Sequence, residues 1–107
     1  MTESPLPGAV NIDTIDRVLH EPARLQIAAL LYVVEKAEFL FVMNQTGLTW
    51  GNLSSHLAKL EHNEYVAIKK SFKGKRPLTT VTLTVKGRAA FKAYTEKMRQ
   101  LFKELPA

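Results

Sequence analysis

The chain has 107 residues, enough for one domain with a hydrophobic core and too few for two. With 46% hydrophobic and 23% charged residues it has the composition of a globular protein, and no apolar run is long enough to cross a membrane. The absence of cysteine excludes disulfide bonds, thiol catalysis and thiolate metal sites. Because the N-terminus also lacks the basic and apolar regions of a signal peptide, we expect a cytoplasmic protein.

The formal net charge of +5 is distributed unevenly along the chain. Residues 1–58 contain three Lys or Arg and six Asp or Glu, a net charge of −3, whereas residues 59–107 contain twelve and four, a net charge of +8. Such an asymmetry is typical of a neutral or acidic body with one basic region directed at a polyanion. Solvated basic helices give the same asymmetry, so the motifs must distinguish the two interpretations.

The N-terminal part of the chain divides into a tail and the start of a domain. Residues 1–10 are rich in Pro and Gly, and we expect them to form a flexible tail. Residues 11–107 are expected to form a single domain. A short helix with an apolar face is expected over residues 11–19.

Two further helices are predicted before residue 47. Pro22 suits the first turn of a helix, where its missing amide has no helical partner. The segment from Ala23 to Val34 is apolar on all sides, which predicts a helix buried on most of them. The run Phe39–Thr46 is compatible with a strand or a helix on its periodicity. Gly47, which suits the left-handed residue that ends a helix, favours a helix beginning near Glu38.

The most strongly patterned helix is predicted over Thr49–Glu61. Thr49 is suited to cap it, and one face carries three leucines, Leu53, Leu57 and Leu60, at helical spacing. The opposite face is small or polar: Gly51, Asn52, Ser55, Lys59 and His62. In a helix-turn-helix, a face of short hydrogen-bonding side chains lies in the major groove of DNA. Because an ordinary amphipathic surface helix has the same pattern, the flanking residues decide between these interpretations.

A basic β-hairpin is predicted after this helix. Residues 65–70 and 78–84 alternate and are rich in β-branched residues, as strands are, and residues 71–77 predict a loop between them. We expect Asn63 to supply the left-handed residue that ends the preceding helix. Five cations gather at the end of the hairpin: Lys69, Lys70, Lys73, Lys75 and Arg76. They repel one another unless a polyanion faces them.

A last helix, capped by Thr84, is predicted over about residues 85–105. It carries a heptad-like stripe formed by Phe91, Tyr94, Met98, Leu101 and Leu105. The stripe is compatible with a two-fold dimer interface or with docking on the helix's own domain. We favour the dimer, because the helix is long for a domain that already has a core.

The residues that could carry catalysis or bind a metal are sparse. His20, His56 and His62 are far apart or six residues apart, the wrong spacing for a helical metal site. The sequence contains no phosphate-binding glycine loop, no nucleophile paired with a base and no paired carboxylates. We therefore expect no enzymatic activity, no cofactor and no metal, and no polar cluster marks a site for a small-molecule effector.

The order of the predicted elements is that of a winged helix domain, and four segments resemble a compact family of prokaryotic winged helix-turn-helix regulators related to the MarR and ArsR types. The segments are His20–Leu25, Gly47–Glu61, Gly74–Thr80 and Leu83–Phe91. Together they span roughly residues 13–91. The sequence departs from the family at Glu64, where a glycine is usual, and at Trp50, where a small polar or acidic residue is frequent.

The resemblance implies an α+β, mostly α fold: a winged helix-turn-helix with a two-stranded basic wing and a C-terminal dimerisation helix. It also implies a transcriptional regulator that binds double-stranded DNA as a homodimer and does not associate with membranes. Carried over residue by residue, it places Thr49, Gly51, Asn52, Ser54, Ser55, His56 and Lys59 on the recognition helix and Gly74, Lys75 and Arg76 on the wing. Lys70 and Lys73 complete the expected DNA-binding set. Trp50 either contacts a base or sugar or packs beside the turn, and we favour packing.

In this interpretation Asn52, Ser55 and Lys59 lie nearest the base edges, because Asn can pair with adenine and Lys can reach the acceptors of guanine. Hydroxyl groups at the start of the helix bind phosphates, and Arg76 enters the minor groove. Two copies would read half-sites about one helical turn apart. The alternative function is a winged helix module that binds proteins without specific DNA binding, since fold does not determine function; the basic wing argues against it.

Overall fold

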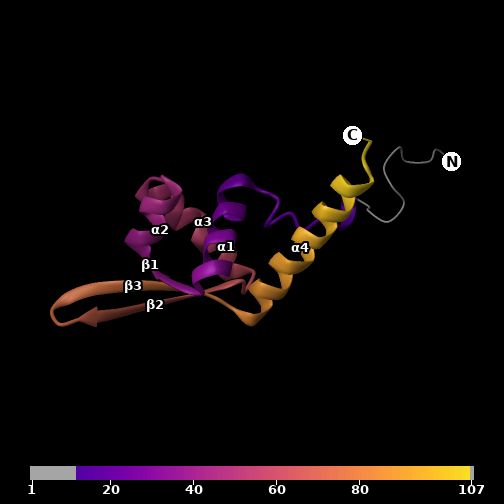
Figure 1. The fold of residues 1–107 in the computed structure, drawn as a ribbon. Helices are drawn as coiled ribbons and strands as arrows, with labels where there is room; N and C mark the ends of the chain where they lie inside the picture. Colours follow the sequence, from indigo (N-terminus) through magenta and orange to yellow (C-terminus); the bar gives the residue numbers. More distant parts are fainter. Residues whose placement is uncertain (1–11, 107) are drawn as a thin grey trace.

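The computed structural model describes residues 12–106, which form a three-stranded antiparallel sheet, four α-helices and one short 3-10 helix (Figure 1). In chain order the elements are η1 (Ile12–Thr14), α1 (Pro22–Val34), β1 (Lys36–Glu38), α2 (Phe39–Thr46), α3 (Trp50–His62), β2 (Val66–Lys73), β3 (Arg76–Leu83) and α4 (Val85–Glu104). The tail predicted for residues 1–10 lies outside the described residues. Within them, no helix combines the length and apolar character that crossing a membrane requires.

The molecule projects at both ends. The strand order is β1-β3-β2, and α1, α2 and α3 lie together over one face of the sheet. The β2–β3 hairpin, here called the wing, extends past these helices at one end, and α4 leaves at the other (Figure 1). The radius of gyration is 16.4 Å, against about 13 Å for a compact domain of this size. The mostly helical α+β fold predicted from the sequence is confirmed.

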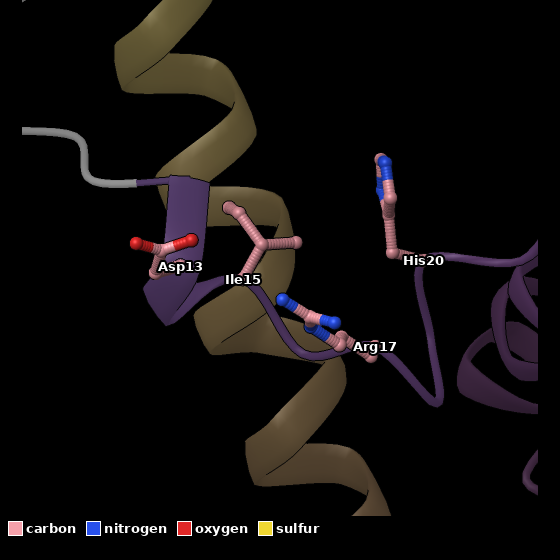
Figure 2. Close-up of a pocket in the computed structure, with 4 residues that line it drawn as sticks. All are labelled: Asp13, Ile15, Arg17 and His20. Carbon is pink, nitrogen blue, oxygen red and sulfur yellow. The ribbon is translucent and has the colours of Figure 1, made fainter. Parts of the chain in front are cut away.

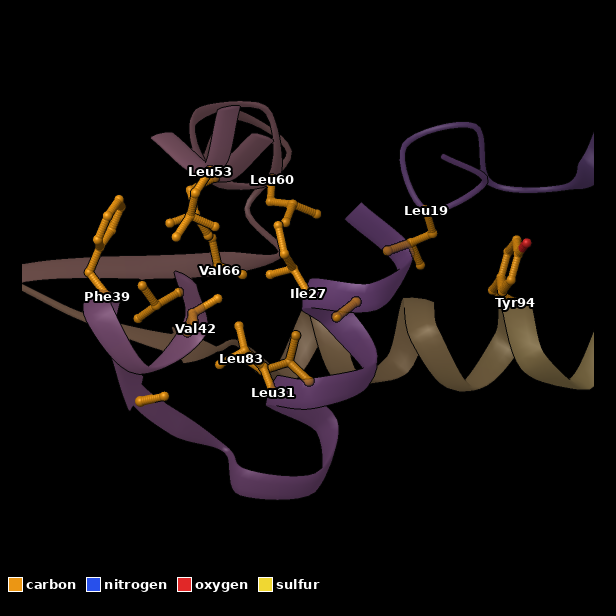
Figure 3. Close-up of a cluster of buried hydrophobic side chains, with 14 of the residues drawn as sticks. Leu19, Ile27, Leu31, Phe39, Val42, Leu53, Leu60, Val66, Leu83 and Tyr94 are labelled. Carbon is orange, nitrogen blue, oxygen red and sulfur yellow. The ribbon is translucent and has the colours of Figure 1, made fainter. Parts of the chain in front are cut away.

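The core lies between the three helices and the sheet (Figure 3). Its largest fully buried side chains are Leu19, Ile27, Leu31, Val42, Leu53, Leu57, Leu60 and Val81. The predicted leucine stripe of α3 is therefore confirmed, and each such side chain contributes roughly 1.5–3 kcal/mol. In α1 the residues Ile27, Ala28 and Leu31 are buried, whereas Val33, in the same turn as Leu31, is 80% exposed, so one side of the last turn faces solvent.

The turn between α2 and α3 agrees with the sequence analysis. Gly47 has a φ of 71°, and its amide donates to the carbonyl of Met43 at 2.9 Å, which ends α2. Thr49 Oγ1 accepts a hydrogen bond from the amide of Asn52 at 3.2 Å, which caps α3. The helix-turn-helix is thus defined by local interactions.

The helix predicted over residues 11–19 is wrong for the part that the structure describes, where η1 is followed by a loop. The Asp16 carboxylate accepts hydrogen bonds from the amides of Val18 and Leu19, at 2.8 and 3.1 Å, and from the Tyr65 hydroxyl. A side chain that satisfies nearby amides in this way competes with helix formation. Burial and the neighbouring Asp16 raise the pKa of Tyr65 to about 12.

The end of α3 is a Schellman motif whose left-handed residue is Glu64, with a φ of 63°. The amide of Tyr65 donates to the carbonyl of Leu60, and that of Glu64 donates to Glu61, both at 2.9 Å. The prediction for Asn63 is wrong, because this residue has a φ of −86°. The strained position is the one at which the related family usually has glycine.

The sheet differs from the prediction in two ways. First, β1 was not predicted; it pairs with β3, with Ala37 opposite Val81. Second, the loop predicted over residues 71–77 is mostly strand, because β2 and β3 remain paired up to Lys73 and Arg76. Only Gly74, with a φ of 66°, and the residue after it form the turn. The wing is therefore longer and narrower than predicted.

The first half of α4 is fixed to its own domain. Thr84 Oγ1 accepts from the amide of Gly87 at 2.9 Å, as predicted, and donates to the carbonyl of Glu64 at 2.6 Å. At Gly87 the helix runs so close to the backbone just before β2 that an added Cβ would lie 2.1 Å from the carbonyl oxygen of Tyr65. Further along, the Tyr94 hydroxyl hydrogen-bonds His20 Nδ1 at 2.7 Å.

Candidate nucleic-acid interface

The polar face of α3 is fully available to a partner. Its members are all exposed: Gly51, Asn52, Ser55, Lys59 and His62. The buried leucines on the opposite face pack into the core and fix the position of the helix and of its polar side chains. This is the arrangement that a helix requires to place short polar side chains against base edges.

His56 occupies a different position from the rest of the predicted set. Its ring is half-buried and turned toward the start of α1, with Nδ1 3.3 Å from Arg24 Nη1 and 3.5 Å from the Glu21 carboxylate. Glu21 also caps α1 by accepting from the amide of Arg24 at 2.8 Å. Burial raises the pKa of Glu21, but hydrogen bonds from the amides of Arg24 and Ala23 and the charges of His56 and Arg24 lower it overall. The cluster ties α3 to α1.

Trp50 packs beside the turn, the role favoured for it, and is also exposed. Its ring packs on Phe39, with 4.4 Å between the ring centroids, yet the residue is 61% exposed. Trp50 and Ser54 line a groove of about 270 Å³ together with Lys70 and other residues of the wing. The structure therefore brings the start of α3 and the base of the wing to one continuous surface.

The wing presents its cations to solvent. Lys70, Lys73 and Lys75 are exposed, and within residues 12–106 neither Lys73 nor Lys75 makes an ion pair. Arg76 pairs with Glu38, with 3.3 Å between Nη2 and Oε1. Both partners are largely exposed, so this pair contributes little to stability.

The predicted stripe on α4 divides into two parts. Tyr94 and Leu101 are buried in the single chain, and Phe91 and Met98 pack against the core, as the docking alternative predicted. Toward the C-terminus, Leu105 is 43% exposed and Phe102 is 62% exposed. Phe102 lies beside the stripe, and the sequence analysis did not identify it. The spacing of three residues between Phe102 and Leu105 was the sequence signal that could have identified Phe102. Beyond the buried Leu101, two apolar side chains are thus exposed, one in the last turn of α4 and one directly after it.

A pocket of about 390 Å³ lies at the other end of the molecule, lined by Asp13, Ile15, Arg17 and His20 and close to α4 (Figure 2). It is remote from the wing tip and does not belong to the surface formed by α3 and the wing (Figure 1). Within residues 12–106 no three His, Asp or Glu side chains are grouped as metal ligands.

Residues 23–102 match the family described as winged helix DNA-binding domain. The chain belongs to this winged helix family. An uncharacterized protein of Methanocaldococcus jannaschii is 40% identical over 89 residues, which cover 83% of this chain and 97% of that protein. The resemblance proposed from the sequence motifs is confirmed.

Solved structures agree with the assignment. A transcriptional regulator homologue from Pyrococcus horikoshii OT3 superimposes on the winged helix protein with a TM-score of 0.82 at 32% identity, covering 86% of this chain and 91% of the other. A MarR-family regulator from Silicibacter pomeroyi gives a TM-score of 0.63 at 20% identity, over 80% and 57% of the two chains, which is a likeness of fold. The winged helix protein is thus similar in fold to transcriptional regulators.

Proposed function

We propose that the winged helix protein is a transcriptional regulator that binds operator DNA as a homodimer, with α3 in the major groove and the wing on the backbone or in the minor groove. The observation that carries the proposal is the continuous surface on which the start of α3 and the cationic wing meet, across a groove lined by Ser54 and Lys70. A duplex needs such a surface, because phosphate contacts position a protein and base contacts give specificity.

Specific recognition would come from the exposed face of α3. Asn52 and Lys59 have the donors and acceptors that read adenine and guanine, and Ser55 lies between them on the same face. The capped N-terminus at Thr49 offers backbone amides to a phosphate. Arg76 would exchange its exposed pairing with Glu38 for a phosphate or for the minor groove.

Dimerisation would use the end of α4 and the residue that follows it, where Phe102 and Leu105 are exposed. Two copies related by a two-fold axis would present two α3 helices to successive major grooves. The half-sites would then lie about 34 Å apart, and the operator would be nearly palindromic.

The first experiment measures binding of the full chain to a random-sequence duplex at several salt concentrations, with the mass of the free protein determined in parallel. We expect a dimer that binds with a steep salt dependence, because each phosphate contact releases counterions. Failure to bind at low salt contradicts the proposal and favours the protein-interaction alternative. If the protein binds the duplex, the next experiment is to select its preferred site from a library of random sequences.

The base-reading role of α3 is tested on the selected site. Asn52→Ala should lower affinity for that site by about 1–3 kcal/mol while leaving affinity for random duplex unchanged. The matched control is Asn44→Ala, since Asn44 is also exposed but lies on α2. Equal effects of the two substitutions on the selected site would contradict the placement of α3.

The dimer interface is tested by Phe102→Lys and Leu105→Lys. Both side chains are exposed in the single chain, so we expect the substitutions to produce folded monomers, measured by light scattering and circular dichroism. Gln100→Lys is the control, because Gln100 is exposed on the same helix and gains the same charge. Dimers that persist in both variants would place the interface elsewhere.

A further inference from the structure

The tip of the wing carries an apolar side chain among its cations. Phe72 is 72% exposed, although it lies one residue from Lys73 and opposite Pro77 in the pairing of β2 with β3. Single exposed apolar residues are common on proteins, so exposure alone carries no conclusion. The position of Phe72 relative to α3 is the second observation.

Strand alternation places Phe72 on the face of the wing that turns toward α3. Side chains two residues apart share a face, and directly paired residues share it across the strands. The residues of this face are Val66, Ile68, Lys70 and Phe72 on β2 and Pro77, Thr79, Val81 and Leu83 on β3. Near the core the face is buried under the helices, and at Lys70 and Thr79 it lines the groove beside α3. Phe72 and Pro77 continue it beyond the helices.

The local structure makes this apolar tip stiff. The strands stay in register to the last pair, Lys73 with Arg76, and the turn contains only two residues. Proline has a fixed φ and no amide hydrogen, so Pro77 limits the backbone opposite Phe72. The aromatic ring therefore projects from a narrow hairpin that is flanked by lysines.

We propose that Phe72, supported by Pro77, enters the minor groove of bound DNA as a wedge that partly unstacks a base step and bends the duplex. Charge complementarity selects DNA as the occupant, since Lys73 and Lys75 flank the wedge where the phosphates of a minor groove lie. Apolar side chains inserted between base steps kink DNA in this way. The inference rests on the proposed function and extends it.

The wedge adds a kind of specificity that α3 cannot supply. Pyrimidine–purine steps unstack more readily than others, so the protein would favour them under the wing without hydrogen-bonding their bases. Sites selected from a random library should therefore carry such steps at a fixed distance outside the sequence read by α3.

The test compares Phe72→Ala with Phe72→Leu on the selected site, using a duplex labelled at both ends for fluorescence energy transfer. Phe72→Ala should lose affinity by about tenfold per wing, the order found when an aromatic side chain that contacts bases is truncated. It should also lose the bend, while the salt slope stays unchanged because no phosphate contact is removed. Leucine is also found as a wedge and should restore most of the bend.

Val33→Ala is the control, because Val33 is 80% exposed on α1, a helix that lies away from the tip of the wing (Figure 1). Phe72→Ala with the wild-type bend overturns the inference, whether or not affinity falls. If the wild-type protein binds no DNA at low salt, the proposed function itself fails and the wedge fails with it. Binding by wild type with no effect of Phe72→Ala overturns the wedge alone.

Discussion

The start of α4 and the tip of the wing lie at opposite ends of β3. They differ in how many of their side chains have hydrogen-bonding or packing partners within the chain. At the start of α4, Thr84 bonds two neighbouring segments and Gly87 touches the backbone of Tyr65. At the wing tip, Phe72 is 72% exposed and Lys73 has no ion pair within the described residues. The first region specifies the fold, and the second is left for a partner. Mutations should therefore affect stability at one end and binding at the other.

The largest effect is expected for Gly87→Ala. The new Cβ would lie 2.1 Å from the carbonyl oxygen of Tyr65, so strand and helix must separate, and we expect a loss of about 3 kcal/mol or more in the free energy of unfolding. Urea denaturation measures it. Gly51→Ala is the control: a Cβ there meets nothing within 4 Å, and the helix should gain about 0.5 kcal/mol. Similar stabilities would show that α4 is not held as closely as described.

The wing should show the opposite response. Lys73→Gln together with Lys75→Gln should leave the free energy of unfolding within about 0.5 kcal/mol of wild type, because both side chains are exposed. The same variant should reduce the salt slope of DNA binding by about 1 for each lost phosphate contact. Lys92→Gln and Lys103→Gln, exposed on α4, form the control pair. A wing variant with an unchanged slope argues against contact between wing and DNA.

The N-caps of α3 and α4, Thr49 and Thr84, allow a second comparison of stability. Thr49→Ala removes one cap bond from α3 and should cost about 1 kcal/mol. Thr84→Ala also removes the hydrogen bond to the carbonyl of Glu64, so it should cost about 1 kcal/mol more. Thermal denaturation of the two single variants compares them directly. Equal costs would mean that the link from Thr84 to the end of α3 contributes nothing.

The smallest effect is expected at the ion pair between the wing and β1. Glu38→Gln breaks the pairing with Arg76, but both side chains are more than half exposed, so stability should change by less than about 0.5 kcal/mol. DNA affinity should rise slightly, because Arg76 is released and one repelling carboxylate is lost. Lower affinity would indicate that Glu38 orients Arg76 for binding.

Local sequence signals predicted the parts of the fold that depend on local interactions. The turn at Gly47, the cap at Thr49 and the leucine stripe all lie within one short segment, and the structure has them as predicted. The motifs around this segment also indicated the correct family. The DNA-binding and dimerisation residues remain predictions, and the structure qualifies three of them by turning His56 toward α1 and burying Tyr94 and Leu101 in the single chain.

The failures have two physical causes: a partner that is distant in sequence, or a local hydrogen-bond pattern that hydrophobic periodicity does not reveal. The strand β1 has three residues and exists because Ala37 pairs with Val81. The segment after Thr14 is a loop because the Asp16 carboxylate satisfies local amides and meets Tyr65. Glu64 adopts a left-handed backbone despite its side chain because the chain must reverse there into β2.

The sequence by itself thus determined the helix-turn-helix, the cationic hairpin, the capped last helix and the family, since each follows from spacing, capping residues or motifs within a few turns of chain. Only the tertiary structure decided how far the wing extends, which face of it carries Phe72, and how much of α4 is used within the chain. Those properties depend on strand register and on contacts between distant segments, which periodicity does not encode.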